Sequence, residues 1–319
     1  MGGQGTEAVG WLGTGRMGFE LVHRLAADYD VVVYNRSRAK AEPLTAYGVT
    51  VANCAAELAG CDIVFATVGT PADLLEAVLG PDGLVSRGRA PRIVVDCSTV
   101  SVEASAAVRA RLAEFGAELL AAPVMGNPKV AAAGRLTLAV SGSRAAFDEA
   151  LPYLERLGAG ATYVGDGELA RTVKICHNLF LGVVTQSLAE VTVLAEKSGI
   201  SRQTFLACLN NSVVGSMFTR YKTPAFVNAD FHPTFTAKLL RKDFDLGLSA
   251  AEQLDVPLPV AALVEQIILT LIGNGHGEDD FSSLLELQAA AAGLPLVSEN
   301  AEVSDGLVPV SPDNRDALR

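Results

Sequence analysis

Short apolar runs alternate with amphipathic segments along the first half of the chain. Strand-like runs lie at 8–12, 31–34, 63–68, 93–96, 136–141 and 161–164, with helical patterns at 71–79, 102–115 and 144–157. Strands that alternate with helices are typical of a parallel sheet with helical crossovers. Residues 1–164 are therefore predicted to form an α/β domain built on a doubly wound parallel sheet.

The second half opens with about thirty residues, between Gly165 and Gly199, that contain no proline and a single glycine. At 1.5 Å per residue they predict a helix of roughly 45 Å, apolar nearly all round as a buried helix is. Helical patterns continue to residue 292 and predict an all-helical domain, 165–292, joined to the first domain by this long helix. Residues 293–319 are polar and show no regular apolar pattern, which favours a mobile tail.

Two polar residues interrupt the apolar surface of the long helix. Lys174 and Asn178 are four residues apart, so their side chains share one face. A buried ammonium loses hydration unless it is paired or releases its proton, which favours a functional role. A lysine whose charged end reaches solvent is the alternative.

A glycine-rich segment follows the first strand and leads into a helical pattern. In a unit of this spacing the first glycine makes a tight turn, the second leaves room for a pyrophosphate, and the third brings the helix close to the strand. The N–H groups at the start of the helix add an anion site. The segment predicts a Rossmann-type dinucleotide-binding domain with these cofactor ligands: Gly13, Thr14, Gly15, Arg16, Met17 and Gly18.

The second strand ends where an NAD enzyme carries an acidic residue for the ribose hydroxyls. This chain has Asn35, Arg36 and Ser37 there. An arginine with short polar neighbours can receive the 2′-phosphate of NADP(H), whereas a carboxylate would repel it. We therefore expect NADP(H) to be preferred over NAD(H); a solvated basic loop is the alternative.

Ligands of such sheets bind beyond the carboxyl ends of the strands. Three strand ends supply candidates, namely Val68 with Gly69, Thr99, and Met125 with Gly126. Thr99 could equally be a helix cap, since threonine is common where a strand leads into a helix.

Composition narrows the possible partners. The 319 residues include 36 acidic and 25 basic ones, a formal charge of −11, and no basic patch, which argues against nucleic acid or an anionic membrane. No uninterrupted apolar run reaches the length of about eighteen residues that spans a bilayer, and the N-terminus does not resemble a signal peptide, so a cytoplasmic protein is expected. The five cysteines and four histidines show no metal-ligand spacing, so no metal site is predicted.

Several motifs in order resemble the β-hydroxyacid dehydrogenases, the group of 3-hydroxyisobutyrate dehydrogenase, tartronate semialdehyde reductase and glyoxylate/succinic semialdehyde reductase. The resemblance covers roughly residues 8–290 and rests on the glycine loop, Asp96 to Thr99, Ala122 to Gly126, Gly134 to Thr137, Gly165 to Gly167 with Lys174 and Asn178, and Lys242 to Leu246.

The resemblance implies a role for individual residues. Lys174 would be the general acid and base of hydride transfer between the nicotinamide and a β-hydroxyacid or its semialdehyde or ketoacid, with Asn178 holding substrate. Thr99 would lie at nicotinamide and substrate, and Lys242 would reach the cofactor. Phe235 and Asp243 would line the substrate cleft. The long helix would pack against a second subunit, which implies a homodimer that could pair into a tetramer.

One departure concerns the substrate. The family usually has Asp-Ala-Pro-Val-Ser-Gly-Gly where residues 121–127 read AAPVMGN, so Met125 replaces a serine that donates to the substrate carboxylate. Gly126, Asn127 or Lys129 could supply the lost contact, or Met125 could indicate a bulkier, less polar carbonyl substrate. The identity of the substrate and the physiological direction stay open.

Two further functions stay open beside the dehydrogenase. An imine reductase has a similar fold but generally lacks a lysine at position 174. A non-catalytic NADP-binding module would leave the Lys174 face without a role.

Overall fold

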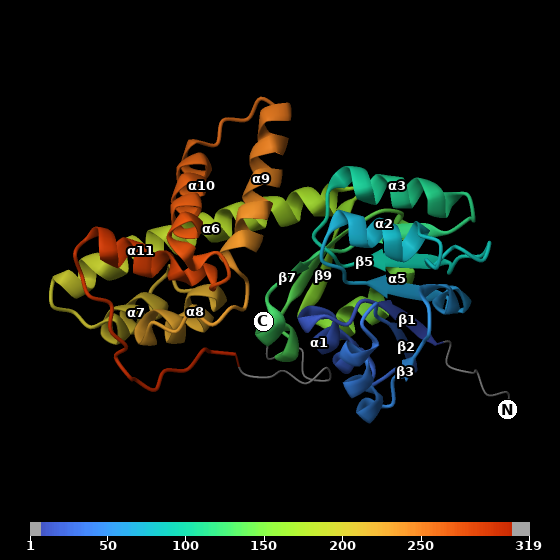
Figure 1. Ribbon diagram of the computed structural model, residues 1–319, viewed down its shortest axis with the longest axis horizontal. Helices are drawn as coiled ribbons and strands as arrows, with labels where there is room; N and C mark the ends of the chain where they lie inside the picture. The colour runs from blue at the N-terminus through green and yellow to red at the C-terminus, as the bar shows by residue number, and fades with distance from the viewer. Residues whose placement is uncertain (1–7, 308–319) are drawn as a thin grey trace. The chain divides into compact units, whose positions relative to one another are not determined.

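The computed structural model describes residues 8–307, which form two compact units. Described residues up to Lys174 belong to unit 1, and those from Ile175 onward belong to unit 2. The boundary falls within one continuous helix, α6 (Leu169–Lys197), which corresponds to the predicted long helix (Figure 1).

Unit 1 is built on a nine-stranded sheet, counted over the described residues, in the order β3-β2-β1-β4-β5-β6-β8-β7, with β9 paired to β8. Strands β3 to β6 along this order are parallel, whereas β8 pairs antiparallel with β6 and β7. The predicted α/β sheet is confirmed, with an antiparallel edge added to it. The strands are β1 Val9–Leu12, β2 Val31–Tyr34, β3 Thr50–Val51, β4 Ile63–Ala66, β5 Ile93–Asp96, β6 Glu118–Ala121, β7 Val124–Met125, β8 Thr137–Ser141 and β9 Gly160–Gly165.

Helices of unit 1 cover the sheet in two groups. Helix α2 packs beside α3, and α1 packs beside α4 and α5, as expected of a doubly wound sheet. All four residues of β1, β4 and β5 are buried, so the centre of the sheet is the core. The helices are α1 Arg16–Leu25, α2 Pro71–Leu79, α3 Val102–Ala113, α4 Pro128–Ala132 and α5 Arg144–Leu157, with 3₁₀ turns at Arg38–Lys40, Glu42–Tyr47 and Ala55–Gly60.

Unit 2 is helical, and small residues bring its helices together. A Cβ at Gly182 of α6 would lie 2.5 Å from the Phe244 ring of α9, and one at Gly247 of α9 would lie 2.7 Å from the Leu179 side chain of α6. The single glycine inside the long helix is therefore a site of close helix contact. The helices are α7 Arg202–Asn210, α8 Met217–Asn228, α9 Ala237–Gln253, α10 Pro259–Leu271 and α11 Leu284–Ala291, with short turns at Ile272–His276 and Phe281–Ser283.

Helix α6 is long and apolar enough to cross a membrane by length and composition alone, with a mean hydropathy of 1.4 over an 18-residue window. No uninterrupted apolar run in the sequence predicts such a span, because polar residues divide every apolar run of α6. Since 56% of that window is buried inside the protein, the pattern is that of a core helix.

The expected mobile tail differs from the structure over residues 293–307. This segment has no regular secondary structure, yet four of its apolar side chains, those of Leu294, Leu296, Ala301 and Val303, pack against the helices of unit 2. Both Glu299 carboxylate oxygens accept backbone N–H groups at the start of α7, from Arg202 at 2.7 Å and Gln203 at 3.0 Å. A carboxylate in this position satisfies N–H groups that the helix leaves unpaired, and it fixes the segment. The rest of the predicted tail, 308–319, lies outside the described residues.

Candidate active site

Two glycines of the predicted cofactor loop are required by the fold. Gly13 has φ +90°, and a Cβ there would lie 2.1 Å from the Thr67 carbonyl oxygen. A Cβ at Gly18 would lie 2.1 Å from the Gly13 carbonyl oxygen. Gly15 differs, because a Cβ built on it meets nothing within 4 Å. The open space beside Gly15 fits a bound cofactor.

The surroundings of Gly15 also suit a phosphate group. Gly15 is the N-cap of α1, which has no side-chain cap and no acidic residue in its first turn, where Arg16 and Met17 lie. The buried Thr14 Oγ1 has no hydrogen-bond partner among the described residues. An uncapped helix start beside an unpaired hydroxyl matches the anion site predicted from the glycine pattern.

We expect Gly15→Ala to bind NADPH at least tenfold more weakly with little change in Tm, because the Cβ enters the space left for the cofactor and the backbone (φ −65°) accepts alanine. Gly18→Ala should instead lower Tm, because its Cβ meets backbone. Thermal melts and NADPH titrations of both variants check this, and a Gly15→Ala protein with unchanged NADPH affinity would contradict it.

At the end of β2, Asn35 has a structural contact that the sequence did not reveal. Its side-chain oxygen accepts from Thr14 N at 2.8 Å and its amide donates to the Ser37 carbonyl at 2.9 Å, which ties this strand end to the glycine loop. Ser37 is the N-cap of the 3₁₀ turn Arg38–Lys40. Arg36 points outward, with 86% of its side chain exposed.

The ends of β4 and β5 are joined by Ser98. Its Oγ accepts from Val68 N at 2.9 Å, and its own N–H donates to Asp96 Oδ1 at 3.0 Å. Gly69, next in the chain, is exposed. Thr99 does not cap the following helix, because Ser101 is the N-cap of α3, where its Oγ accepts from Ala104 N at 3.3 Å. The structure thus removes the helix-cap alternative for Thr99.

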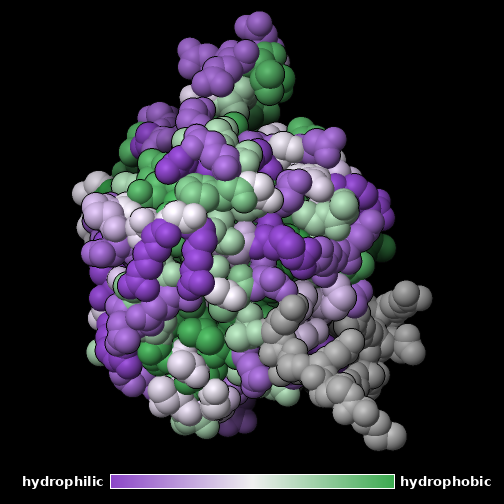
Figure 2. All heavy atoms as spheres, turned by 90° about the vertical axis from the view of Figure 1, so that its right-hand side faces the viewer, coloured by the Kyte–Doolittle hydropathy of each residue, from purple (hydrophilic) through white to green (hydrophobic). Residues whose placement is uncertain are grey.

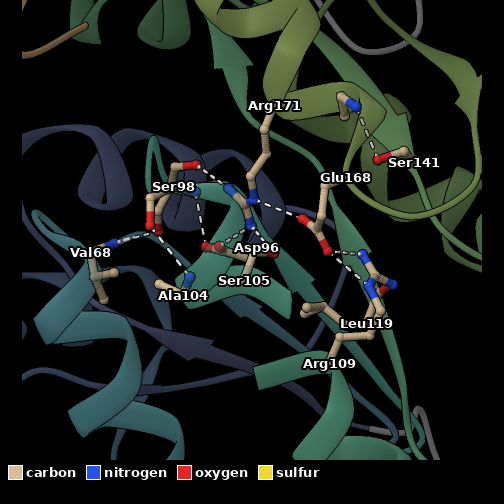
Figure 3. A network of polar contacts seen from close by, with 12 residues as sticks. Val68, Asp96, Ser98, Ala104, Ser105, Arg109, Leu119, Ser141, Glu168 and Arg171 are labelled. Atoms are coloured by element: carbon tan, nitrogen blue, oxygen red, sulfur yellow. Dashed lines mark hydrogen bonds and ion pairs between the residues drawn. The ribbon is translucent and has the colours of Figure 1, made fainter. Parts of the chain in front are cut away.

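A buried polar network, missed in the sequence, holds the start of α6 (Figure 3). Arg171 is 2% exposed, and its guanidinium donates to Asp96 Oδ2 at 2.6 Å, Ser105 Oγ at 2.8 Å and the Ser98 carbonyl at 3.1 Å. Its Nε donates to Glu168 Oε2 at 3.0 Å. Arg171 lies one turn before Lys174, so the network fixes the part of the helix that carries the lysine.

Glu168 joins this network to α3. Its Oε1 accepts from Arg109 Nε at 2.8 Å, and Arg109 also donates to the Gly167 carbonyl at 2.9 Å. Burial acts to raise the pKa of Glu168, but the hydrogen bond from Ser105 and the charges of Arg109 and Arg171 outweigh it and lower that pKa. The carboxylate therefore stays charged between two guanidinium groups.

Lys174 and Asn178 are both buried on α6, at 8% and 2% exposure. Within unit 2, Asn178 Nδ2 donates to Asp243 Oδ2 at 2.5 Å, and Asn178 Oδ1 lies 2.8 Å from His177 Nδ1. The buried Asp243 Oδ1 has no hydrogen-bond partner among the described residues and lies 3.6 Å from Lys242 Nζ. Three predicted site residues of unit 2, Asn178, Lys242 and Asp243, thus form one cluster.

A second buried cluster, formed by Lys222, Asp280 and Phe281, fixes the position of Phe235, and the sequence did not reveal it. Its ring packs edge-on against Phe281, with 5.8 Å between centroids, and its N–H donates to Asp280 Oδ2 at 3.2 Å. Asp280 Oδ1 lies 2.5 Å from Lys222 Nζ, and both residues are buried.

The loop that carries Met125, which replaces a serine of the family, lies in unit 1. Met125 pairs with Thr137 of β8 and packs, half-buried, against three small residues, Ala121, Ala139 and Ala170. Asn127 is the N-cap of α4, and its Oδ1 accepts from Val130 N at 3.0 Å. The side-chain oxygen of Asn127 therefore caps helix α4. Gly126 is half-buried and Lys129 is exposed.

No group of three or more histidine, cysteine or acidic residues that could hold a metal ion occurs within residues 8–307. His276 Nδ1 lies 2.9 Å from Asp279 Oδ2, a local contact within residues 276–280, which also contain Glu278 and Asp280.

Both halves of the chain match known families. Residues 8–165 match the NAD-binding domain of 6-phosphogluconate dehydrogenase, and residues 169–288 match the NAD-binding domain of NADP-dependent 3-hydroxyisobutyrate dehydrogenase. The chain is 32% identical to 2-(hydroxymethyl)glutarate dehydrogenase of Eubacterium barkeri over 90% of its own length and 96% of that protein.

A second relative and a solved structure indicate the same family. The chain is 28% identical to the chloroplastic glyoxylate/succinic semialdehyde reductase 2 of Arabidopsis thaliana, over 90% of this chain and 81% of the relative. The solved structure of 3-hydroxyisobutyrate dehydrogenase from Salmonella typhimurium superposes with a TM-score of 0.79 at 27% identity, covering 88% of this chain and 99% of that one. The chain therefore belongs to the β-hydroxyacid dehydrogenases, the nicotinamide-dinucleotide-dependent oxidoreductases that include 3-hydroxyisobutyrate dehydrogenase and glyoxylate/succinic semialdehyde reductase.

Proposed function

We propose that this chain moves a hydride between NADP(H) and a β-hydroxyacid or its semialdehyde or ketoacid, with Lys174 as the general acid and base. One observation carries the proposal: a buried lysine lies one helical turn before Asn178, whose amide is held by Asp243. A buried amine that shares a helix face with a fixed amide is suited to proton transfer with a bound substrate, which favours a role in the reaction over a structural accident.

The chemistry that the cofactor supplies when bound is hydride transfer at the nicotinamide ring. In carbonyl reduction Lys174 stabilises the negative charge that develops on the substrate oxygen and gives it a proton from Nζ; in alcohol oxidation neutral Lys174 takes the hydroxyl proton. Asn178 orients the substrate, because Asp243 fixes its Nδ2, and its Oδ1, which lies 2.8 Å from His177 Nδ1, keeps a second lone pair that can accept from the substrate.

In this proposal residues 1–164 supply the cofactor ligands other than Lys242. Residues 165–292 make the subunit contact and bind the substrate together with the loop of Met125 to Asn127. The glycine loop and Thr14 would hold the pyrophosphate, and Arg36 would receive the 2′-phosphate, which supports NADP(H) over NAD(H). Val68, Gly69, Thr99 and Lys242 complete the proposed cofactor ligands. Phe235, Asp243 and the loop of Met125 to Asn127 complete those for substrate.

Met125 supports a second candidate substrate class. A thioether cannot donate a hydrogen bond to a carboxylate, whereas the serine that Met125 replaces can. A carbonyl substrate that is bulkier or less polar at this position would suit Met125 better than a small carboxylic acid.

A substrate screen tests the proposed function. Oxidation of NADPH and of NADH is followed with semialdehydes, 2-oxo acids, bulkier ketoacids and cyclic imines. We expect turnover with at least one carbonyl class and higher kcat/KM with NADPH. Turnover of imines alone would favour an imine reductase, and binding of NADPH without hydride transfer to any substrate would favour a non-catalytic module.

A homodimer formed through α6 is the proposed assembly, in a cytoplasmic protein. Within residues 8–307, most exposed large apolar side chains belong to unit 2. On α6, Phe180, Val191 and Leu194 share one face, with exposures of 70%, 42% and 68%. On the face drawn in Figure 2, hydrophilic side chains surround several smaller groups of hydrophobic ones.

We expect Phe180→Asp to shift the protein toward monomer, because a carboxylate on this apolar face opposes burial. Sedimentation velocity of the variant and of wild type measures the shift, with exposed Thr172→Asp on the same helix as control. A wild-type protein that sediments as a monomer at high micromolar concentration would rule out the assembly.

A further inference from the structure

Two charged side chains of unit 1 meet beyond the end of β2. Arg36 Nη1 lies 3.1 Å from Asp73 Oδ1. The arginine that would receive a 2′-phosphate is therefore already paired with a carboxylate.

Asp73 is fixed in this position by helix α2. Thr70 is the N-cap of α2, and its Oγ1 accepts from Asp73 N at 3.1 Å and donates to Asp73 Oδ2 at 2.8 Å. A carboxylate at the third helical position is also favoured by the helix dipole. With Oδ2 held by Thr70, Oδ1 faces Arg36. The Asp73 side chain is 31% exposed and is held in one place, whereas the Arg36 side chain is 86% exposed and can change its rotamer toward a ligand.

We propose that Asp73 is a specificity-determining residue that restrains the preference for NADP(H) and lets the chain bind NAD(H) as well. This inference rests on the proposed function in one respect, that Arg36 faces the adenosine ribose. A 2′-phosphate carries close to two negative charges, has to draw Arg36 away from Asp73, and then lies near a fixed carboxylate. The 2′-hydroxyl of NAD(H) carries no charge and can donate to that carboxylate.

Titration of NADPH and NADH into the full chain, followed by the fluorescence of the reduced nicotinamide, tests the inference by Kd. Asp73→Asn keeps the side-chain shape and the Thr70 contacts but removes the charge. We expect its Kd for NADPH to fall roughly three- to tenfold, while its Kd for NADH stays level or rises. Asp148→Asn removes a charge from another exposed pair, with Arg144 at 2.8 Å, and should leave both Kd values unchanged.

A second variant separates this inference from the cofactor assignment. Arg36→Ala should weaken the binding of NADPH much more than the binding of NADH. When Asp73→Asn is added to Arg36→Ala, the gain in NADPH affinity should be smaller than in the wild-type background, because Asp73 no longer competes with the 2′-phosphate for Arg36. If Arg36→Ala weakens NADPH selectively but Asp73→Asn leaves both Kd values unchanged, the role of Asp73 is refuted and the cofactor assignment stands. If Arg36→Ala weakens both cofactors equally, the preference for NADP(H) is itself refuted.

Discussion

Replacing Lys174 with alanine should lower kcat by about 10²- to 10⁴-fold, the usual contribution of a positioned general acid or base. The variant loses the group that protonates the developing alkoxide and stabilises its charge. We expect the Kd for NADPH to stay within about twofold, because the predicted phosphate ligands lie in the glycine loop. The combination of lost turnover and retained cofactor binding separates a catalytic lysine from a structural one.

The controls for Lys174 use the same helix and the same chemistry. Lys197→Ala removes a lysine from the last turn of α6, where Nζ donates to the Ala292 carbonyl, and should leave kcat unchanged. Added methylamine should partly restore the Lys174→Ala rate, since a small ammonium can occupy the space left by the side chain. Full turnover by Lys174→Ala without any amine would refute the proposed mechanism.

The fold was predictable wherever local periodicity determines it. Strand β2 and helices α2 and α5 have the bounds read from the sequence, since each is a regular apolar run or amphipathic segment between clear breaks. A strand end was expected at Met125, but the start of that strand and its division into β6 and β7 were not predicted, because 118–125 is a short apolar stretch divided by Pro123 and its pairing with β8 is long-range. Helix α4 had a readable signal, Asn127 as a cap directly before Pro128.

Residues of the candidate site could be proposed from the sequence where one helix or one loop carries them. Lys174 and Asn178 share a face by spacing alone, and the glycine loop has its pattern in six consecutive residues. The partners of Arg171 could not be found this way, since Asp96 lies 75 positions away and a buried ion pair leaves no periodic signal. Asn35 was predicted as a cofactor ligand from its place after β2, whereas its contact with Thr14 depends on the loop conformation.

Replacing Asp280 with asparagine should destabilise the protein by about 3–5 kcal/mol at pH 7, because Lys222 would keep a buried charge without its counter-ion. Lys222 Nζ lies 2.5 Å from Asp280 Oδ1 and 4.4 Å from the centroid of the Phe281 ring. Asp280 also accepts from Ser282 and from Thr234, so its loss affects the loop that carries Phe235. The exposed pair of Arg144 and Asp148 is the matched control, and Asp148→Asn should cost less than about 1 kcal/mol.

The pH dependence of unfolding separates the charge of Asp280 from its shape. Burial acts to raise the pKa of Asp280, but the Lys222 charge and the hydrogen bonds from Lys222, Thr234 and Ser282 outweigh it and lower that pKa from 3.8 to about 2. Because the folded pKa is depressed, the stabilisation is complete above about pH 5 and is lost as the pH falls toward 2, a change of about 2 kcal/mol. Urea unfolding followed by circular dichroism at pH 7, 4 and 2.5 should therefore show a smaller decrease in Asp280→Asn than in wild type. Equal decreases in the two proteins would mean that the Asp280 carboxylate contributes no pH-dependent stability.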